Sequence, residues 1–235
     1  MKKIAVITAR AGSRGLKDKN ILLLNGKPLM AYSIEAAIKS ECFDRIIVST
    51  DSQEYGDIAT SYGAEFILRS KENSLDTSTT YDALNELFSK ININEFDYFV
   101  LLQPTSPLRN EKHIIEAVKL FEDNYKKMYS LVSVTETNIT SNLIKTIEED
   151  NTLKNFNLDN MKNYRRQTYK EYYPNGAIYI SKFEHYLKTG NFFGQKSLAY
   201  FMNQEDSVDI DSKIDFELAS IILKNKNNIN FEKNT

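Results

Sequence analysis

The sequence has a single cysteine and only two histidines, and this scarcity excludes several kinds of site. Cys42 has no partner for an internal disulfide, and no site can be built from several cysteine thiolates. His113 and His185 lack the spacing of a metal-binding pair. A zinc centre based on cysteine or histidine is therefore not expected.

Long apolar runs and a strong net charge are also absent. No stretch approaches the ~20 apolar residues that cross a membrane, and residues 1–8 lead into a strand pattern instead of a signal peptide. The formal net charge is −2, so broad attraction to nucleic acid is not expected. No repeat, proline-rich linker or heptad run divides the 235 residues. We expect a cytoplasmic protein with one domain over residues 1–235, no membrane contact and no nucleic-acid partner.

Strand patterns and helical patterns alternate over the first half of the chain. Short apolar runs predict strands at residues 3–8, 45–49, 65–68 and 98–102. Apolar residues at helical spacing predict helices that begin at Pro28, cover residues 53–62, and include residues 81–88 and 114–121. Alternation of this kind predicts an α/β fold with a doubly wound, mainly parallel sheet.

The pattern becomes irregular beyond Met128. Residues 130–134 and 178–181 look like strands, but the residues between them are polar and weakly periodic. We therefore expect this region to be an excursion from the main sheet.

A last helix is predicted close to the end of the sequence. Ser212 and Asp215 have the spacing of a capping box. The apolar face of this helix is expected at Ile214, Leu218, Ile221 and Ile222. We expect the asparagine- and lysine-rich tail after Leu223 to fray.

The loop after the first strand concentrates positive charge. Residues 9–20 read ARAGSRGLKDKN, with four cations and two glycines among twelve residues. Ligands bind at the carboxyl ends of strands in open α/β sheets, where glycine allows backbone N–H groups to approach an anion. Arg10, Arg14 and Lys19 are therefore candidates for neutralising a triphosphate.

This loop fits neither of the two common nucleotide-binding motifs. Gly26 and Lys27 are followed by Pro28 instead of Ser or Thr, and no Gly-x-Gly-x-x-Gly run is present. The alternative is a charged loop that only faces water.

Two carboxylates follow one another at residues 209 and 211. On an extended segment Asp209 and Asp211 emerge on one face, where they could hold one hard cation. Mg²⁺ favours one or two carboxylates together with substrate phosphate oxygens. The local alternative is that both acids cap the helix that begins after Ser212.

The segment after the fourth strand places a polar side chain at a strand end. Gln103 precedes Pro104 and Pro107, and it could bind a hydroxyl or amide of a substrate. A turn with two prolines is more often simple architecture. Similarly, Tyr179, Phe192 and Phe193 fit a hydrophobic core at least as well as a ligand platform.

Five ordered motifs together carry a resemblance over essentially the whole chain. They are the cationic loop at residues 9–20, CFDRIIVSTD at 42–51, LLQPTSPLR at 101–109, PNGAIYI at 174–180 and QEDSVDID at 204–211. The set resembles the acylneuraminate cytidylyltransferases, the CMP-sialic acid synthetases, and is most similar to the bacterial single-domain members.

The resemblance implies a nucleotide-diphospho-sugar transferase-like fold and a defined reaction. CTP would be the donor, and the anomeric hydroxyl of a nine-carbon sialic acid would attack the α-phosphate and displace pyrophosphate. It also implies Mg²⁺, with Mn²⁺ as an alternative, and a homodimer whose excursion is at about residues 128–175.

The resemblance further implies roles for individual residues. Arg10, Lys19, Asp209 and Asp211 would be catalytic, and Asp209 and Asp211 would bind the metal. The nucleotide would contact Arg10, Ala11, Gly12, Ser13, Arg14, Lys19, Asn20, Arg69 and Thr80. The sugar acid would contact Gln103, Lys145, Arg165, Asn175, Tyr179, Phe192 and Phe193, with Lys145 and Arg165 reaching its carboxylate from the partner subunit.

Two positions depart from the pattern, and three other functions stay open. Arg14 replaces a usual lysine, and Tyr173 stands where a relative has arginine.

The acceptor could be a related sugar acid such as legionaminic or pseudaminic acid. A noncatalytic nucleotide-sugar binding protein would need the cations of the loop but not the pair Asp209 and Asp211. Glycosyl transfer is disfavoured, because the cationic loop suits a triphosphate better than it suits a nucleotide sugar.

Overall fold

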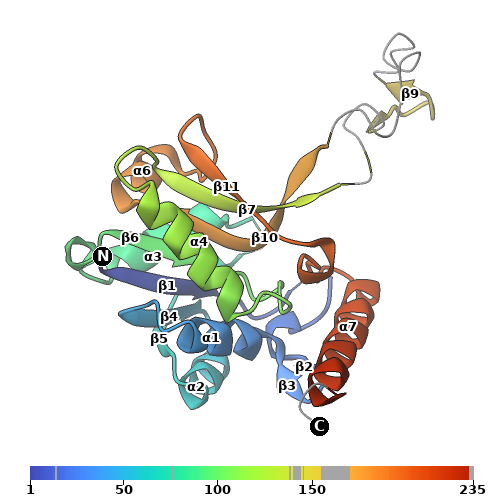
Figure 1. Cartoon of the computed structure of the whole chain (residues 1–235), viewed down its shortest axis with the longest axis horizontal. Coiled ribbons are helices and arrows are strands. Elements are labelled where there is room, and N and C mark those ends of the chain that lie inside the picture. Colours follow the sequence, from blue (N-terminus) through green and yellow to red (C-terminus); the bar gives the residue numbers. More distant parts are fainter. Residues whose placement is uncertain are drawn as a thin grey trace.

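A computed structural model describes residues 1–13, 15–75, 77–137, 139, 144, 146–154 and 170–232 of the chain. The strands of its main sheet are β1 (Lys3–Thr8), β4 (Arg45–Thr50), β5 (Glu65–Leu68), β6 (Tyr98–Leu101), β7 (Ser130–Glu136), β10 (Tyr172–Ser181) and β11 (Ser197–Phe201). Their order across the sheet is β11-β7-β10-β6-β1-β4-β5 (Figure 1). β6, β1, β4 and β5 are parallel, and β10 is antiparallel to both of its neighbours. The expected α/β fold with a mainly parallel sheet is confirmed.

Helices cover both faces of this sheet (Figure 1). They are α1 (Leu29–Lys39), α2 (Gln53–Ser61), α3 (Thr80–Ser89), α4 (Glu111–Asp123) and α6 (Phe183–Thr189), whereas α7 (Lys213–Glu232) belongs to a separate, smaller cluster. Apolar residues of α1, α2 and α4 join one core cluster, and those of α3 and α6 join another.

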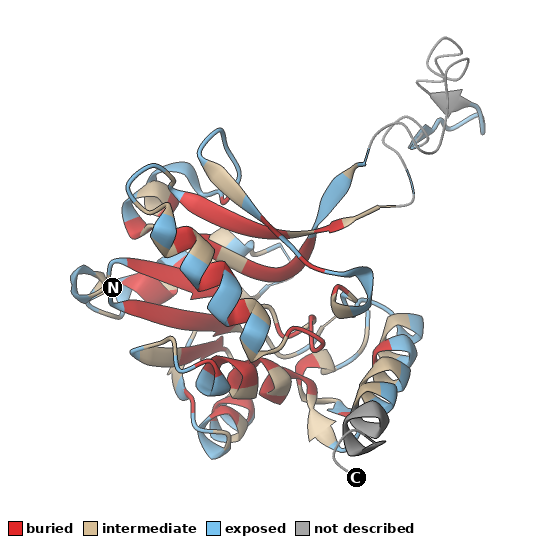
Figure 2. Ribbon diagram, viewed as in Figure 1, coloured by how far each residue is buried: buried red, intermediate tan, exposed pale blue. Residues whose placement is uncertain are grey.

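Strand β1 is buried along almost its whole length (Figure 2), and it divides the two cores by simple alternation. Ala5 and Ile7 face the helices α1, α2 and α4, whereas Ile4 and Val6 face α3 and α6. All four side chains are fully buried, as expected for a central strand of a sheet with helices on both faces.

Smaller elements complete the chain. The short 3₁₀ turns are η1 (Lys19–Ile21), η2 (Glu72–Ser74), η3 (Ile93–Glu95) and η5 (Gln204–Asp206), and the short strands are β2 (Leu23–Leu24), β3 (Lys27–Pro28), β8 (Thr146–Ile147) and β9 (Leu153–Lys154). β2 pairs with β3, and β8 pairs with β9 in a hairpin that lies apart from the main sheet (Figure 1).

The predicted elements of the first half agree with the structure to within a few residues at their ends. The second half needs correction, because β7 and β10 belong to the main sheet and not to an excursion. β10 begins at Tyr172, well before the predicted position, and its register shifts between Pro174 and Tyr179. That shift breaks the apolar alternation from which a strand is recognised. The sequence analysis predicted neither α6 nor β11.

The last helix differs from its prediction in two respects. The capping box is confirmed, because Asp215 N donates to Ser212 Oγ and Ser212 N donates to Asp215 Oδ2. However, the chain stays helical to Glu232 and does not fray after Leu223. The expected apolar face is also wrong, because Ile214 is 76% exposed, and Leu218 and Ile221 are exposed as well.

The buried face of α7 is built around a small residue instead. Ala219 is fully buried against Leu24, Leu29 and Ile210, with Phe216 packed beside it. A small side chain lets the helix approach the β2–β3 hairpin closely, which the larger isoleucines would prevent.

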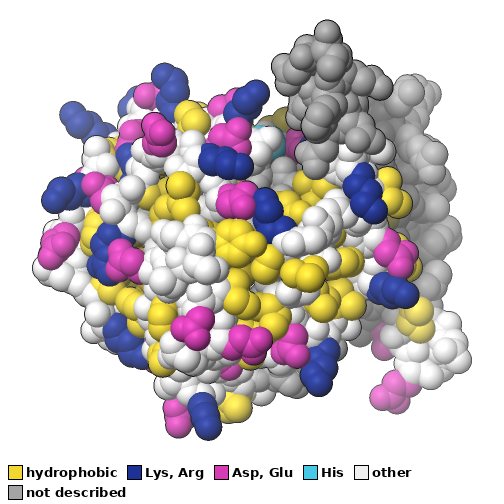
Figure 3. Space-filling view, turned by 90° about the horizontal axis from the view of Figure 1, so that it is seen from below, with side chains coloured by type: hydrophobic (Ala, Val, Ile, Leu, Met, Phe, Trp, Pro, Cys, Tyr) yellow, Lys and Arg dark blue, Asp and Glu magenta, His cyan; other side chains and the backbone are white. Residues whose placement is uncertain are grey.

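The surface is in keeping with the composition. No helix in the part of the chain that the structure describes is both long and apolar enough to span a membrane. On the face seen in Figure 3, Lys and Arg side chains are intermingled with Asp and Glu side chains. No broad basic surface covers that face.

Candidate active site

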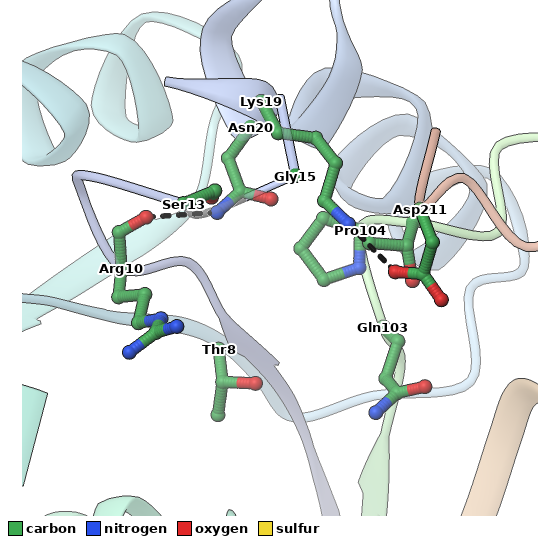
Figure 4. A pocket seen from close by; sticks show the side chains of 10 residues that line it. Thr8, Arg10, Ser13, Gly15, Lys19, Asn20, Gln103, Pro104 and Asp211 are labelled. Atoms are coloured by element: carbon green, nitrogen blue, oxygen red, sulfur yellow. Dashed lines mark hydrogen bonds and ion pairs between the residues drawn. The ribbon is translucent and has the colours of Figure 1, made fainter. Parts of the chain in front are cut away.

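A cavity of about 410 Å³ opens where β1 and β6 end, at their carboxyl ends (Figure 4). The loop after β1 contributes Arg10, Ser13, Gly15, Lys19 and Asn20 to its wall. The turn after β6 contributes Gln103, Pro104 and Thr105, and Asp211 closes a third side. The structure therefore brings the cationic loop, Gln103 and one of the two predicted metal ligands together.

A second cavity of about 240 Å³ adjoins the first, because Thr8 and Arg10 line both. Its remaining wall comes from the segment between β5 and α3 and from the start of α3, with Arg69, Asn73, Leu75, Ser78, Thr79, Thr80 and Ala83. The two cavities together form one cleft across the carboxyl ends of the parallel strands, where open α/β sheets bind ligands.

The cationic loop is held by hydrogen bonds to acids that the sequence analysis did not single out. Ala11 N donates to Asp51 Oδ1 at 2.9 Å, and Gly12 N donates to Asp18 Oδ1 at 3.3 Å. Asn20 is buried and its Nδ2 donates to the carbonyl oxygen of Arg10 at 3.0 Å. The N–H groups of Ala11 and Gly12 thus fix the loop, and neither residue lines the cavity wall.

Lys19 joins this loop to the acidic segment. Its Nζ lies 3.0 Å from Asp211 Oδ1 and also donates to the carbonyl oxygen of Ile210 (Figure 4). The Lys19 side chain is 11% exposed, whereas that of Asp211 is 82% exposed. Gly15 makes the close approach possible, because a Cβ there would lie 2.4 Å from the Asp211 carbonyl oxygen.

The segment carrying both acids belongs to no helix or strand, and burial alternates along it. Ile210 is fully buried and its N–H donates to Thr105 O at 2.8 Å, while Asp209 and Asp211 on either side are exposed. The helix cap is made by Ser212 and Asp215, so the Asp211 side chain is not needed for it. The capping alternative for Asp211 therefore loses its main support.

Asp209 lies beside Gln103 and Gly176. A Cβ on Gly176 would lie 2.9 Å from Gln103 Oε1 and 3.3 Å from Asp209 Oδ2, and Gly176 has φ +79°. Although Asp209 keeps contact with solvent, the protein packed around its carboxylate raises its pKa, and the charge of Asp211 adds to this. A hydrogen bond with Thr105 opposes the shift.

The charge at this site fits a divalent cation. Burial is the main reason why the pKa of Asp209 is raised, and the negative charge of Asp211 adds to it, so a cation beside these carboxylates would stabilise the ionised form of Asp209. Among the described residues no group of three or more His, Cys, Asp or Glu side chains could enclose a metal ion. Asp209 and Asp211 could supply two oxygen ligands to Mg²⁺, which takes few protein ligands and completes its shell with water and phosphate oxygens.

Arg69 and Thr80 both line the smaller cavity, as the resemblance implies. Arg69 Nε donates to Ser74 Oγ at 3.1 Å, and its Nη2 is buried without a partner among the described residues. Burial lowers the pKa of Arg69. Thr80 is the first residue of α3 and is exposed.

The residues expected to contact the sugar acid differ in how far they are exposed. Tyr179 is half-buried close to Asp209, whose charge, after desolvation, helps to raise the Tyr179 pKa. Phe193 is 50% exposed, so its ring can meet a ligand. Phe192 is 7% exposed and its ring lies 5.0 Å from that of Tyr179 and 4.6 Å from that of Tyr186, so it is a core residue.

Asn175 has a different place from the one expected. It is 2% exposed, and its Nδ2 donates to Ser207 Oγ at 2.8 Å while its Oδ1 accepts from Ser133 Oγ at 2.6 Å. Its side chain therefore holds β10 against its surroundings, directly before Gly176, instead of facing the cavity. Arg14, Lys145 and Arg165 lie outside the described residues.

Arg109, the last residue of the motif at residues 101–109, is a buried cation behind the site for which no role was predicted. Arg109 is 1% exposed, its Nε donates to Ala177 O at 3.3 Å, and its Nη2 contacts Ser33 Oγ and Gln103 O. Burial lowers its pKa to about 9, so the side chain stays charged at neutral pH. It ties the turn after β6 to β10 and α1.

Comparisons with known proteins agree with this geometry. A family model described as cytidylyltransferase matches residues 4–233. An N-acylneuraminate cytidylyltransferase of Escherichia coli is 49% identical over 226 residues, which is 96% of this chain and 53% of that protein. The chain thus spans about half the length of this relative. A CMP-N,N'-diacetyllegionaminic acid synthase of Legionella pneumophila is 35% identical over 229 residues, which is 95% of this chain and 97% of that protein.

A solved structure extends the likeness to the fold. A CMP:2-keto-3-deoxy-manno-octonic acid synthetase complexed with CTP superposes with a TM-score of 0.71 at 15% sequence identity. The match covers 96% of this chain and all of that chain. At this identity the likeness concerns the fold alone.

Proposed function

Because this chain belongs to the cytidylyltransferase family, we propose that it transfers CMP from CTP to a sialic acid and releases pyrophosphate. The acceptor we propose is N-acetylneuraminate, joined through its anomeric hydroxyl. The observation that carries the proposal is the junction of the cationic loop with the acid pair, with Lys19 Nζ 3.0 Å from Asp211 Oδ1. The residues proposed to bind the triphosphate and those proposed to bind the cation thus lie in one cleft.

The reaction forms one bond and breaks another at the same phosphorus. The anomeric oxygen bonds to the α-phosphorus of CTP as the proton of its hydroxyl passes to solvent, the bond from that phosphorus to the bridging oxygen breaks, and pyrophosphate leaves with its electron pair. Reactions of this kind depend on positioning and on neutralising charge. Arg10 and Lys19 lie where they can neutralise the phosphates, and Asn20 holds the backbone of Arg10 in place.

Asp209 and Asp211 would hold the magnesium ion. When bound, Mg²⁺ would neutralise charge on the phosphates that the enzyme binds. Lys19 pairs with Asp211, so this lysine would share one carboxylate with the proposed metal site.

The two cavities suggest that the triphosphate and the base of the nucleotide bind in different places. The larger one holds the cationic loop and suits the triphosphate, whereas the smaller one has Arg69, Asn73 and Thr80 and suits the cytosine. The sugar acid would then lie towards Gln103, Tyr179 and Phe193. We further propose that Lys145 and Arg165 bind its carboxylate from the second subunit of a homodimer, with residues of the region 128–175 between the subunits. A cytoplasmic location stays a prediction.

A related sugar acid is the second candidate acceptor. The relative from Legionella pneumophila is named for a legionaminic acid and is matched over 97% of its length. The noncatalytic alternative is disfavoured, because a binding protein has no need of the pair Asp209 and Asp211.

A pyrophosphate-release assay tests the proposal. Each of CTP, UTP, ATP and GTP is offered with N-acetylneuraminate, and CTP is then offered with a panel of nine-carbon sugar acids. We expect turnover with CTP and N-acetylneuraminate, and far less with ATP or GTP. Equal use of ATP would overturn the donor assignment, and a strong preference for legionaminic acid would move the acceptor to the second candidate.

A further inference from the structure

The wall of the smaller cavity is clamped from behind by one carboxylate. Glu86 on α3 accepts hydrogen bonds from Ser70 N at 2.7 Å, Ser70 Oγ at 2.8 Å, Asn73 Nδ2 at 2.7 Å and Lys90 Nζ at 2.6 Å. Its side chain is only 12% exposed. Lys90 also donates to Leu68 O at 2.7 Å, so the clamp extends to the end of β5.

Only one residue of this clamp also lines the cavity. Asn73 contributes to the cavity wall, together with Arg69 and Thr80. Glu86 itself does not line it, so any effect of Glu86 on a bound nucleotide must pass through its neighbours.

The contact with Glu86 decides which way the Asn73 amide faces. An ionised carboxylate can only accept hydrogen bonds, so the NH₂ group of Asn73 must face Glu86. Asn73 Oδ1 then accepts no hydrogen bond from the residues that the structure describes. One acceptor in the wall of the cavity is thereby left for a ligand.

We propose that Glu86 is a positioning residue that makes Asn73 Oδ1 a reader of the exocyclic amino group of cytosine. The inference rests on the proposed function and adds a basis for choosing CTP over UTP. Cytosine offers an N–H donor at its 4-position, where uracil has a carbonyl oxygen. Opposed to Oδ1, that carbonyl would leave two acceptors facing each other without a donor, which is unfavourable because neither oxygen then gains a hydrogen bond.

Without Glu86 the same asparagine would lose this selectivity. A free amide can turn over and offer its NH₂ group to the uracil carbonyl as readily as its oxygen to the cytosine amino group. Selection therefore requires the carboxylate and the asparagine together.

The test compares kcat/KM for CTP and UTP in the wild type, Glu86→Gln and Asn73→Ala. Glutamine can donate as well as accept, so it no longer forces one orientation on Asn73. We expect the CTP:UTP ratio of kcat/KM to fall by about tenfold or more in both variants. For CTP the change should lie in KM more than in kcat. Glu65→Gln is the control, because Glu65 pairs with Arg45 outside both cavities and should leave the ratio unchanged.

Several outcomes would overturn the inference. A wild-type ratio in folded Glu86→Gln and in folded Asn73→Ala, with melting temperatures measured on the same samples, would do so. A loss of equal size for both nucleotides would mean that Glu86 only stabilises the segment, and this also overturns it.

Calorimetric binding separates this inference from the proposed function. If the wild type turns over no nucleotide, the proposed function fails, and the affinities for CTP and UTP decide the inference. A wild-type preference for CTP that is lost in Glu86→Gln supports it. Equal affinities in the wild type, or a preference that Glu86→Gln retains, overturn it.

Discussion

Asp209 and Asp211 flank the buried Ile210, and this alternation directs both acids to solvent at the same end of the sheet. Asp211 bonds to Lys19 of the cationic loop, while the neighbouring Asp215 caps α7. Two acids four residues apart thus have separable roles.

We predict that Asp211→Asn lowers turnover by about a hundredfold or more, because the amide keeps the size but loses the charge that binds Mg²⁺. Asp209→Asn should behave similarly, and excess Mg²⁺ should restore part of the loss. Turnover and melting temperature are measured on the same samples.

Asp215→Asn is the matched control. Its carboxylate serves the cap, so we expect a loss of roughly 1 kcal/mol in stability with near-normal turnover. A destabilised but fully active Asp211→Asn enzyme, with unchanged Mg²⁺ dependence, would show that the metal binds elsewhere.

Gly176 shows how a residue without a side chain shapes the site. It has φ +79°, and Gly26 has φ +84°, so alanine at either position adopts a backbone conformation that is unfavourable for it. Only at Gly176 would the new Cβ also meet Gln103 and Asp209, since no atom lies within 4 Å at Gly26.

We therefore predict that both Gly176→Ala and Gly26→Ala lose about 1 kcal/mol of stability. Only Gly176→Ala should also lose turnover, because Gln103 or Asp209 must move to make room for the methyl group. Chemical denaturation and steady-state kinetics check the two expectations. Equal turnover in the two variants would mean that the contacts around Gly176 have no catalytic importance.

Single residues of the site were predictable to the extent that their chemistry is visible in a motif. Lys19, Gln103 and Asp211 carry charged or polar groups at strand ends, and they line the larger cavity. Asp18 and Asp51 were missed because their function is to accept hydrogen bonds from Gly12 and Ala11. Such a contact depends on the folded path of the loop and leaves no pattern in the sequence.

At the scale of elements, Glu86 connects α3 to the segment after β5. Desolvation alone would raise the pKa of its carboxyl, but its hydrogen bonds outweigh this effect and lower the pKa to about 2, from an ordinary value of 4.5. A folded-state pKa below the unfolded one means that the unfolded chain takes up the proton first. The stabilisation is therefore complete above about pH 4.5 and is lost as the pH falls towards 2.

We predict that wild type is more stable than Glu86→Gln by the same amount at pH 7 and pH 5, on the order of 1 kcal/mol or more. The difference should shrink at pH 3, because there the carboxyl of Glu86 is protonated in the unfolded chain, which stabilises the unfolded state of the wild type but not that of the amide variant. Urea unfolding midpoints of both proteins at these three pH values provide the measurement. A difference that stays constant down to pH 3 would contradict the depressed pKa of Glu86.

Elements were predictable where they alternate regularly. The strands β1, β4, β5 and β6 and the helices α1, α2 and α3 have clean apolar periodicity, since each packs against a core. The prediction for β10 covered only the end of the strand, because its register shift includes Gly176 and interrupts the strand pattern. Gly176 lies beside Gln103 and Asp209 of the site. In α7 the spacing of large apolar residues was misleading, because close packing placed Ala219 inside and Ile214 outside.

At the scale of the whole molecule, the cleft combines segments that lie far apart in the chain. Residues 8–20 meet residues 103–105 because β1 and β6 are neighbours in the sheet, and Ile210 N bonds to Thr105 O. A doubly wound sheet predicts that loops meet at this edge. It does not predict that the acid segment, which follows β11 at the far side of the sheet, returns to the same edge.

The resemblance also predicts that each site is completed by a second subunit. If Arg165 acts across a dimer, then Arg165→Ala and Asp211→Asn each inactivate a different half of a shared site. A heterodimer of the two variants would contain one site with both defects and one site with none. Differently tagged copies of the two variants, expressed together and purified by both tags, provide this heterodimer.

We predict that this heterodimer has about half the turnover of the wild-type dimer, whereas each variant alone is nearly inactive, because one of its two sites is intact. Lys145→Ala in place of Arg165→Ala should give the same result. The control is a heterodimer of Asp209→Asn with Asp211→Asn, which has a defect in both sites if these two acids act within one subunit, as their common segment requires. Light scattering measures the mass of each preparation. If the heterodimer of Arg165→Ala and Asp211→Asn is as inactive as its control, Arg165 acts in the same subunit as Asp211. A fully active monomer would show that no second subunit is needed.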